Sequence, residues 1–375
     1  MNVLFVWTGL TGYMGDAWRA LARESGIRLK VVIQAQRQET ARFDASVTLR
    51  ELDYTLLDED ESADTTQLGE QIQRFAPDVM YIVGWRRTLP RYVATASFLE
   101  EVPKVLIFDL PFKWSVKKMI APVVLRLYLR RFCGCFVPGA RAARYARWLG
   151  FKENGLGWVE TGLFCANVRK FDGVWQRRRG MTSYPRRFLF TGRYVREKGL
   201  DVLVSAYKRY RELAGHQPWE LTCCGMGPLG KLFKGVEGIR DAGFVQPDDL
   251  PRIFQEHGAF VITSSHEPWG VVIAEAAAAG LPIVCTEACG AALDVVSGNG
   301  AICKVGDCEG IAHAMLAIDL METESRKEMG RKGLALALQF SCERWVSHVA
   351  SMTKNIVDRR RLQQKKAENN EKYVP

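Results

Sequence analysis

Two glutamates, Glu267 and Glu275, stand eight positions apart in the stretch SSHEPWGVVIAEAAAAGLPIV (264–284). The pattern predicts the end of a strand, a turn that holds Glu267, and then a helix of small residues that holds Glu275. Such a helix packs its alanines against a sheet, and a glutamate is seldom buried there without something for it to bind. Glu275 could accept both hydrogen bonds of a cis-diol such as ribose, and Glu267 could accept hydrogen bonds from sugar hydroxyls. The alternative is that Glu275 pairs with a nearby arginine or lysine.

A basic pair stands in a second turn, FTGRYVREKGLD (190–201), between a predicted strand and a predicted helix. Arg193 and Lys198 point from this turn towards a helix N-terminus, where backbone N–H groups already favour anions. Two cations there suit a diphosphate, and the alternative is a turn with solvated charges. The N–H groups of Gly270 and Val271, at the start of the other helix, could also meet phosphate oxygens.

Three further loops carry weaker signals. The turn CCGMGPLGK (223–231) contains Gly225 and Gly227, which allow close approach of a ligand but are also typical of a structural turn. The loop TGLTGYMGD (8–16) has its glycines out of register with the dinucleotide-binding pattern GxGxxG. Asp58-Glu59-Asp60 look like a metal-binding DxD motif, but they lie in an acidic loop, which favours a solvated charge run.

The elements that must position these residues alternate between strands and helices. Apolar runs predict strands at 3–7, 29–33, 79–84, 104–108, 135–139, 186–192, 220–225, 258–264 and 282–286. Helical patterns lie between them, for example at 17–26, 65–77, 200–213 and 248–257. Buried strands that alternate with helices are typical of parallel sheets covered on both faces. We therefore expect an α/β protein with two doubly wound, Rossmann-like domains that face each other across a cleft.

The domain boundaries follow from a polar, basic stretch near the middle of the chain, DGVWQRRRGMTSYPRR (172–187), which we interpret as a linker. This predicts an N-terminal domain over 1–171 and a C-terminal domain over 188–345. A final helix with a charged tail is expected over 346–375.

The net charge of +10 is unevenly distributed. Residues 112–152 contain ten basic residues and no acidic one, which predicts an anionic partner. Within this segment, Ile120, Val123, Val124 and Leu127 recur at helical spacing. That spacing favours either a helix in a membrane interface or a packed surface helix. The segment lacks an aromatic stacking platform and any recognition motif for nucleic acid, so we expect no nucleic-acid partner.

Other features limit the compartment and the chemistry. The N-terminus is typical of a buried strand rather than of a signal peptide, and the most apolar run, 119–129, is too short to span a bilayer. The ten cysteines form no metal-type pairs and the five histidines no ligand pair, so we expect reduced thiols and no metal site. The chain is expected in the cytoplasm, or peripherally on the inner face of the membrane.

These motifs resemble those of the retaining glycosyltransferases of family 4, which have the GT-B fold. The resemblance is best over 186–300, where TGRYVREKGLDVLVSAY, CGMGPL, the run from GFVQPDDL to GLPIV, and CGAALDVVSGNGAI follow in the family's order. The E-x7-E motif formed by Glu267 and Glu275 is its most specific sign. The first half of the chain matches in its strand–helix order and in GYMGDAWRALA.

The resemblance implies a hexosyltransferase-like enzyme with a UDP- or GDP-sugar as donor substrate and no cofactor. Arg193 and Lys198 would stabilise the donor diphosphate, and Glu275 would bind the ribose diol. Glu267, with the backbone of Gly270 and Val271, would contact the donor sugar and phosphate.

Three residues complete the implied site. Gly227 would approach the donor from the C-terminal domain, and Gly15 would lie beside the diphosphate from the N-terminal, acceptor-side domain. Family members commonly place a histidine after an N-domain strand, but this sequence has no histidine before His216. Asp109, in LIFDLPF, is the candidate substitute, because a carboxylate there could orient a sugar hydroxyl or the acceptor.

The implied reaction is metal-independent transfer of the sugar, with retention, to a membrane-associated glycolipid or polysaccharide. Negative charge develops on the departing diphosphate, and cations and helix N-termini can stabilise that charge. Two other functions stay open from the residues alone. One is a sugar-nucleotide epimerase of the same fold, and the other is a catalytically silent, basic module that binds membranes.

Overall fold

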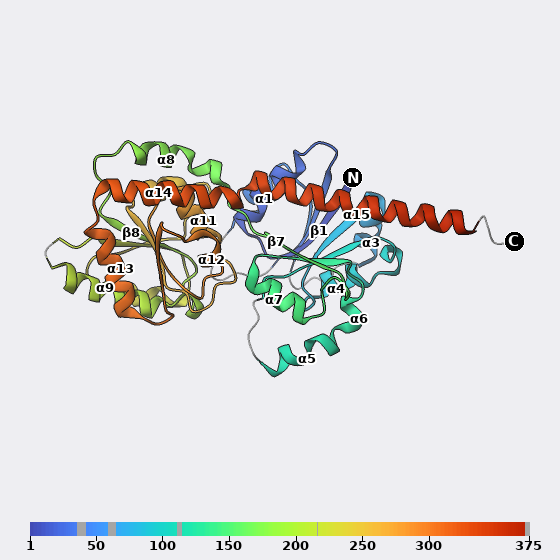
Figure 1. Ribbon diagram of the computed structural model, residues 1–375, viewed down its shortest axis with the longest axis horizontal. Coiled ribbons are helices and arrows are strands. Elements are labelled where there is room, and N and C mark those ends of the chain that lie inside the picture. The colour runs from blue at the N-terminus through green and yellow to red at the C-terminus, as the bar shows by residue number, and fades with distance from the viewer. Residues whose placement is uncertain (36–42, 59–64, 111–114, 216, 372–375) are drawn as a thin grey trace. The chain divides into compact units, whose positions relative to one another are not determined.

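The computed structural model describes residues 1–35, 43–58, 65–110, 115–215 and 217–371 (Figure 1). The chain forms two compact units, each with its own parallel sheet. Of the described residues, unit 1 takes in 1–35, 45–163 and 343–371, and unit 2 takes in 43–44 and 164–342.

The centre of unit 1 is a seven-stranded parallel sheet in the order β3-β2-β1-β4-β5-β6-β7. Its strands are β1 (Asn2–Thr8), β2 (Arg28–Gln34), β3 (Asp53–Leu57), β4 (Val79–Val83), β5 (Lys104–Ile107), β6 (Gly134–Val137) and β7 (Trp158–Thr161). Its helices are α1 (Gly12–Ala22), α2 (Ala45–Thr48), α3 (Thr65–Phe75), α4 (Thr88–Thr95), η1 (Ser97–Leu99), α5 (Val116–Val124), α6 (Arg126–Leu129), α7 (Ala140–Trp148) and α15 (Cys342–Glu371).

Helices cover both faces of this sheet because successive side chains of a strand point to opposite sides. Leu4 and Val6 of β1 belong to a core formed with α3, α4, α6 and α7. Phe5 faces the other side, with its ring centroid 6.1 Å from Trp18 of α1 and 6.1 Å from Trp345 of α15. The buried strands are therefore apolar on both faces, as a doubly covered parallel sheet requires.

The last helix returns to unit 1. The indole nitrogen of Trp345 donates to the carbonyl of Leu163 at 2.8 Å, and the hydroxyls of Tyr81 and Thr353 lie 2.8 Å apart. Thr353 is fully buried, so α15 is part of the unit 1 core rather than a loose extension.

Unit 2 contains a six-stranded parallel sheet in the order β10-β9-β8-β11-β12-β13. Its strands are β8 (Arg187–Thr191), β9 (Glu220–Cys224), β10 (Ile239–Gly243), β11 (Ala259–Ile262), β12 (Ile283–Thr286) and β13 (Gly300–Cys303). Its helices are η2 (Val168–Phe171), α8 (Asp172–Arg179), η3 (Arg196–Lys198), α9 (Leu200–Ala214), η4 (Pro228–Phe233), α10 (Leu250–Gln255), α11 (Val271–Ala278), α12 (Ala292–Val295), α13 (Cys308–Asp319), α14 (Thr323–Ala337) and η5 (Leu338–Phe340).

The predicted class, two doubly wound parallel α/β units, is confirmed, and a strand is present at each of the nine predicted positions. The sequence did not predict β3, β7, β10 and β13, and these four are the edge strands of the two sheets. Edge strands are covered less completely, and none of the four carries a buried residue. They therefore lack the continuous apolar run on which the prediction depended.

The structure divides the chain differently from the expected boundaries. Unit 2 begins at Phe164, and residues 172–187, expected to be a linker, contain helix α8. Arg178 of this helix is fully buried and donates to the carbonyls of Ala279 (3.0 Å), Phe254 (2.9 Å) and His257 (3.0 Å). One of the arginines that make this stretch polar in sequence thus binds the ends of two other helices.

Among the described residues, no helix combines the length and the apolar character that crossing a bilayer requires.

Candidate functional site

The loops that follow β8 and β11 form the centre of the candidate site in unit 2. The two strands are parallel neighbours, so their carboxyl ends lie at the same edge of the sheet. The hydroxyl of Thr263 donates to the carbonyls of Gly199 (2.9 Å) and Lys198 (3.1 Å), and the N–H of Ser265 donates to the carbonyl of Glu197 (2.8 Å). These bonds hold the basic loop and the acidic loop together, in the region where parallel sheets bind ligands.

Lys198 and Glu267 form an ion pair across these two loops. Their side chains are 13% and 12% exposed, so the pair is largely shielded from water. A lysine ammonium has three donors. One donor is used by Glu267, and the others can still bind an anion at the strand ends.

The position of Glu267 is fixed from a third loop, the one after β12. Glu267 pairs with Cys289 as an isolated parallel bridge, and the N–H of Gly290 donates to the carbonyl of Glu267 at 3.1 Å. Burial raises the pKa of the Cys289 thiol to about 11, and the nearby charge of Glu267 contributes to the same shift. The thiol beside the pair therefore stays protonated and is a packing group rather than a nucleophile.

Arg193 supplies a second cation to the same edge. It lies in the loop between β8 and η3, and its side chain is exposed. Among the described residues, no hydrogen bond or ion pair engages that side chain. Its guanidinium group can therefore reach an anion without first breaking another contact in this part of the chain.

Helix α11 begins directly after this turn. Gly270 precedes it with a left-handed backbone (φ +92°), and no side chain caps the helix. The first N–H groups of a helix have no partner within the helix, so those at Val271 and Val272 can bind phosphate oxygens, whereas that of Ile273 donates to the carbonyl of Gly270 at 2.9 Å. A Cβ atom at position 270 would lie 3.0 Å from Cγ of Glu267, so both the conformation and the space favour glycine here.

Glu275 occupies the one open face of α11. Val272 and Glu275 are half-buried, and every other residue of this helix is buried. Residues three apart share a helix face, so these two side chains define a single accessible stripe on a helix that is otherwise core. The alanine run thus has a packing role, and Glu275 is the polar group that the helix presents.

The turn between Glu267 and α11 is held rigidly. The N–H of Ala291 donates to the carbonyl of Trp269 at 2.7 Å, and the indole of Trp269 donates to Asp294 at 2.9 Å. Trp269 is 1% exposed. The proline–tryptophan–glycine sequence therefore anchors the turn that connects Glu267 to the helix of Glu275.

Gly227 lies in the loop after β9, and its backbone packs against the loop after β8. A Cβ at this position would lie 2.6 Å from the carbonyl oxygen of Tyr194, and the N–H of Tyr194 donates to the carbonyl of Met226 at 2.8 Å. Close backbone packing therefore accounts for this glycine, and its predicted contact with a donor stays a prediction.

Two candidate residues lie in unit 1. Gly15 is in helix α1, where a Cβ would lie 2.4 Å from the carbonyl oxygen of Thr48, so α2 packs directly on the glycine. Asp109 is half-buried and follows β5, at the carboxyl end of the sheet as predicted. Asp58 is described, whereas Glu59 and Asp60 of the DxD-like run lie outside the described residues.

In the structure, Arg193 and Lys198 follow β8 and Glu267 follows its neighbour β11, while Glu275 lies in α11, and their proposed contacts with a ligand stay predictions. The sequence interpretation missed the direct pairing of Lys198 with Glu267 and the role of the loop after β12. The glycine at position 290 was the sequence signal that could have indicated this loop. Its backbone lies so close to the turn after β11 that a Cβ there would be 2.2 Å from the carbonyl oxygen of Pro268.

Comparison with known proteins agrees with this geometry. Residues 185–318 match the family model described as glycosyl transferases group 1. The lipopolysaccharide core biosynthesis glycosyltransferase LpsE of Rhizobium meliloti is 37% identical over 161 residues, which are 40% of this chain and 45% of LpsE. The matched part thus spans less than half of that relative.

Solved structures share the fold of the whole chain. Sucrose-phosphate synthase from Thermosynechococcus elongatus superimposes with a TM-score of 0.70 at 14% identity, covering 94% of this chain and 98% of that one. HepE of Anabaena in complex with UDP-glucose gives a TM-score of 0.69 at 19% identity, covering 95% and 100%. Residues 185–318 are thus similar to the group 1 glycosyltransferases, and the two parallel α/β units of the chain form a fold of the GT-B type.

Proposed function

We propose that this protein is a retaining glycosyltransferase that takes a sugar from a nucleotide-diphospho-sugar. The observation that carries the proposal is the group at the carboxyl ends of β8 and β11. Two cations, the uncapped start of α11 and a glutamate on the open face of that helix gather there. This set matches the parts of a nucleotide-sugar, because cations and N–H groups suit the diphosphate and a carboxylate suits a diol.

The chemistry follows from where charge develops. Cleavage of the sugar–phosphate bond leaves negative charge on the departing diphosphate, and Arg193, Lys198 and the N–H groups at Val271 stabilise it. Glu267 positions Lys198 through the ion pair and contacts the donor sugar. Because these groups supply the positive charge, we expect transfer without a divalent cation, and EDTA leaves the rate unchanged. A loss of activity that Mg²⁺ or Mn²⁺ restores would contradict this part.

The acceptor in this proposal is a membrane-associated glycolipid or polysaccharide. LpsE, the relative described above, is named for the synthesis of the lipopolysaccharide core, which supports a glycolipid. The basic segment 112–152 supports association with an anionic membrane surface. Asp109 of unit 1 is proposed to orient a sugar or acceptor hydroxyl, on the basis of its place at the end of β5.

The test is a thermal-shift screen with UDP- and GDP-sugars, followed by a donor-hydrolysis assay with the best ligand. A ligand that binds only the folded state must raise the melting temperature. Glu275→Gln is expected to remove that rise without lowering the melting temperature of the ligand-free protein. Glu212→Gln, at an exposed position on α9, is the matched control and should behave as the wild type. An unchanged shift in Glu275→Gln would contradict the proposed donor site.

A further inference from the structure

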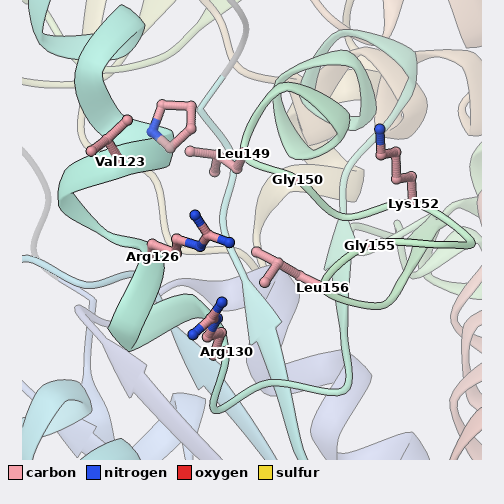
Figure 2. Close-up of a pocket in the computed structure, with 9 residues that line it drawn as sticks. Val123, Arg126, Arg130, Leu149, Gly150, Lys152, Gly155 and Leu156 are labelled. Carbon is pink, nitrogen blue, oxygen red and sulfur yellow. The ribbon is translucent and has the colours of Figure 1, made fainter.

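Unit 1 contains a hollow of about 690 Å³ between α5, α6 and the loop after α7 (Figure 2). It is lined by Pro122, Val123, Arg126, Arg130, Leu149, Gly150, Lys152, Gly155 and Leu156. In Figure 2, Arg126 and Arg130 extend from the helices on one side towards Leu156, and Lys152 belongs to the loop on the other side. The hollow thus combines three cations with an apolar lining.

The three cations are not neutralised by neighbouring carboxylates. Among the described residues, no ion pair or side-chain hydrogen bond engages Arg126, Arg130 or Lys152. The nearest acidic residue in the sequence, Glu153, is exposed in the same loop, and no ion pair joins it to the three within the described part. A concave site with uncompensated positive charge concentrates field lines and attracts an anion.

The helix side of the hollow is held in place by an unusual bond. Pro122 lies inside α5 and has no N–H, so the carbonyl of Lys118, four residues earlier, loses its normal helical donor. The indole N–H of Trp148 in α7 donates to that carbonyl at 3.1 Å. Tyr128 of α6 is anchored in turn, because its hydroxyl donates to the carbonyl of Gly84 at 3.0 Å. The arginines therefore project from a fixed support.

An exposed apolar face adjoins the hollow. The side chains of Val116, Val123, Val124 and Leu127 are 69–79% exposed, and Val123 also lines the hollow. The opposite face of the same helices is inside the unit, where Ala121 is 8% exposed and Leu129 is fully buried. Contiguous exposed apolar residues beside a cationic site mark an interaction surface rather than an ordinary protein surface.

We propose that the hollow binds the phosphate group of an anionic membrane lipid, while the apolar face of α5 and α6 inserts among the acyl chains. The occupant must carry negative charge and apolar chains side by side, which a phospholipid does and a free phosphate does not. Cations near an anionic bilayer and buried apolar side chains each add to such binding. This inference deepens the membrane association in the proposed function and rests on that part of it.

The test is co-sedimentation of the full chain with phosphatidylcholine vesicles that contain or lack phosphatidylglycerol, at low and high salt. R126Q/R130Q/K152Q removes three charges from the hollow. K117Q/R131Q/R147Q removes three exposed charges from the same basic segment outside the hollow and is the matched control. We expect the hollow variant to lose roughly tenfold more phosphatidylglycerol-dependent affinity than the control. V124S/L127S is expected to weaken binding to both kinds of vesicle. The melting temperature of each of the three variants is the check that it is folded.

Equal losses in the two charge variants would overturn the hollow as a specific site and leave only diffuse attraction. Soluble glycerol phosphate added as a competitor distinguishes the source of the phosphate. Tight binding of this compound to the protein without any vesicle binding would overturn the lipid assignment. The assay contains no sugar donor, so its outcome stands apart from the test of the donor site at Glu275.

Discussion

Lys198 and Glu267, which lie 69 positions apart, form a largely buried ion pair at the carboxyl ends of two neighbouring strands of unit 2. The pair joins the basic motif to the E-x7-E motif directly. Each residue positions its partner, and in the proposed site each would also bind the donor. A buried pair of this kind leaves an uncompensated charge when only one member is removed.

The first prediction separates these two roles. Lys198→Met should lower kcat by roughly 10²–10³-fold, because charge builds on the diphosphate only as the bond breaks. The double variant Lys198→Met/Glu267→Gln removes both charges, so it should regain the stability that the single variant loses and stay inactive. Donor-hydrolysis kinetics and melting temperatures give the two readings, with Lys208→Met on the exposed face of α9 as control. Recovery of activity in the double variant would show that Lys198 serves the fold alone.

The second prediction concerns Arg178, which connects α8 to the ends of α10 and α11. Burial lowers the pKa of Arg178 to about 10, and the guanidinium group still satisfies three buried carbonyls at physiological pH. Arg178→Met should cost about 3 kcal/mol or more of unfolding free energy, because those carbonyls lose a charged donor. Arg179→Met, on the exposed side of α8, is the control and should stay within about 0.5 kcal/mol of the wild type. Chemical denaturation measures the unfolding free energy of both variants. Equal losses in Arg178→Met and Arg179→Met would refute the stabilising role of Arg178.

The third prediction is a pH dependence at Lys104 of β5. Its ammonium donates to the carbonyls of Leu99 (2.5 Å), Val102 (3.1 Å) and Glu100 (3.2 Å), and it is 2% exposed. Burial lowers the pKa of Lys104 to about 8, and the nearby charge of Arg131 contributes to the same shift. The unfolded chain holds this proton up to about pH 10.4, so the folded state gains stability as pH rises between the two pKa values.

Lys104→Met removes this titration while other groups continue to titrate. The unfolding free energy of the wild type relative to the variant should therefore rise by on the order of 2 kcal/mol between about pH 8 and pH 10. Denaturation curves for both proteins across that range provide the measurement. A difference that stays constant with pH would show that Lys104 keeps a normal pKa in the folded state.

The sequence by itself determined the central strands and the residue types in the turns of the candidate site. Val3–Val6, Val79–Ile82 and the runs at β11 and β12 are continuous apolar segments, because a strand covered on both faces needs apolar side chains at every position. The turn residues Arg193, Lys198, Glu267 and Glu275 follow strands that a parallel sheet must align, so their common edge could also be predicted.

Only the tertiary structure decided the features that depend on contacts between distant segments. Sequence spacing contains no information on which side chain of a basic loop meets which carboxylate, so the Lys198–Glu267 pair could not be predicted. Arg178 was interpreted as a linker residue because its three acceptors are backbone carbonyls. Every residue carries such a carbonyl, so the sequence gives no sign of these hydrogen bonds. In the same way, the hollow of Arg126, Arg130 and Lys152 arises when α5 and α6 pack beside the loop after α7. Packing of separate segments brings these charges together, and a linear pattern of residues records only their number and spacing.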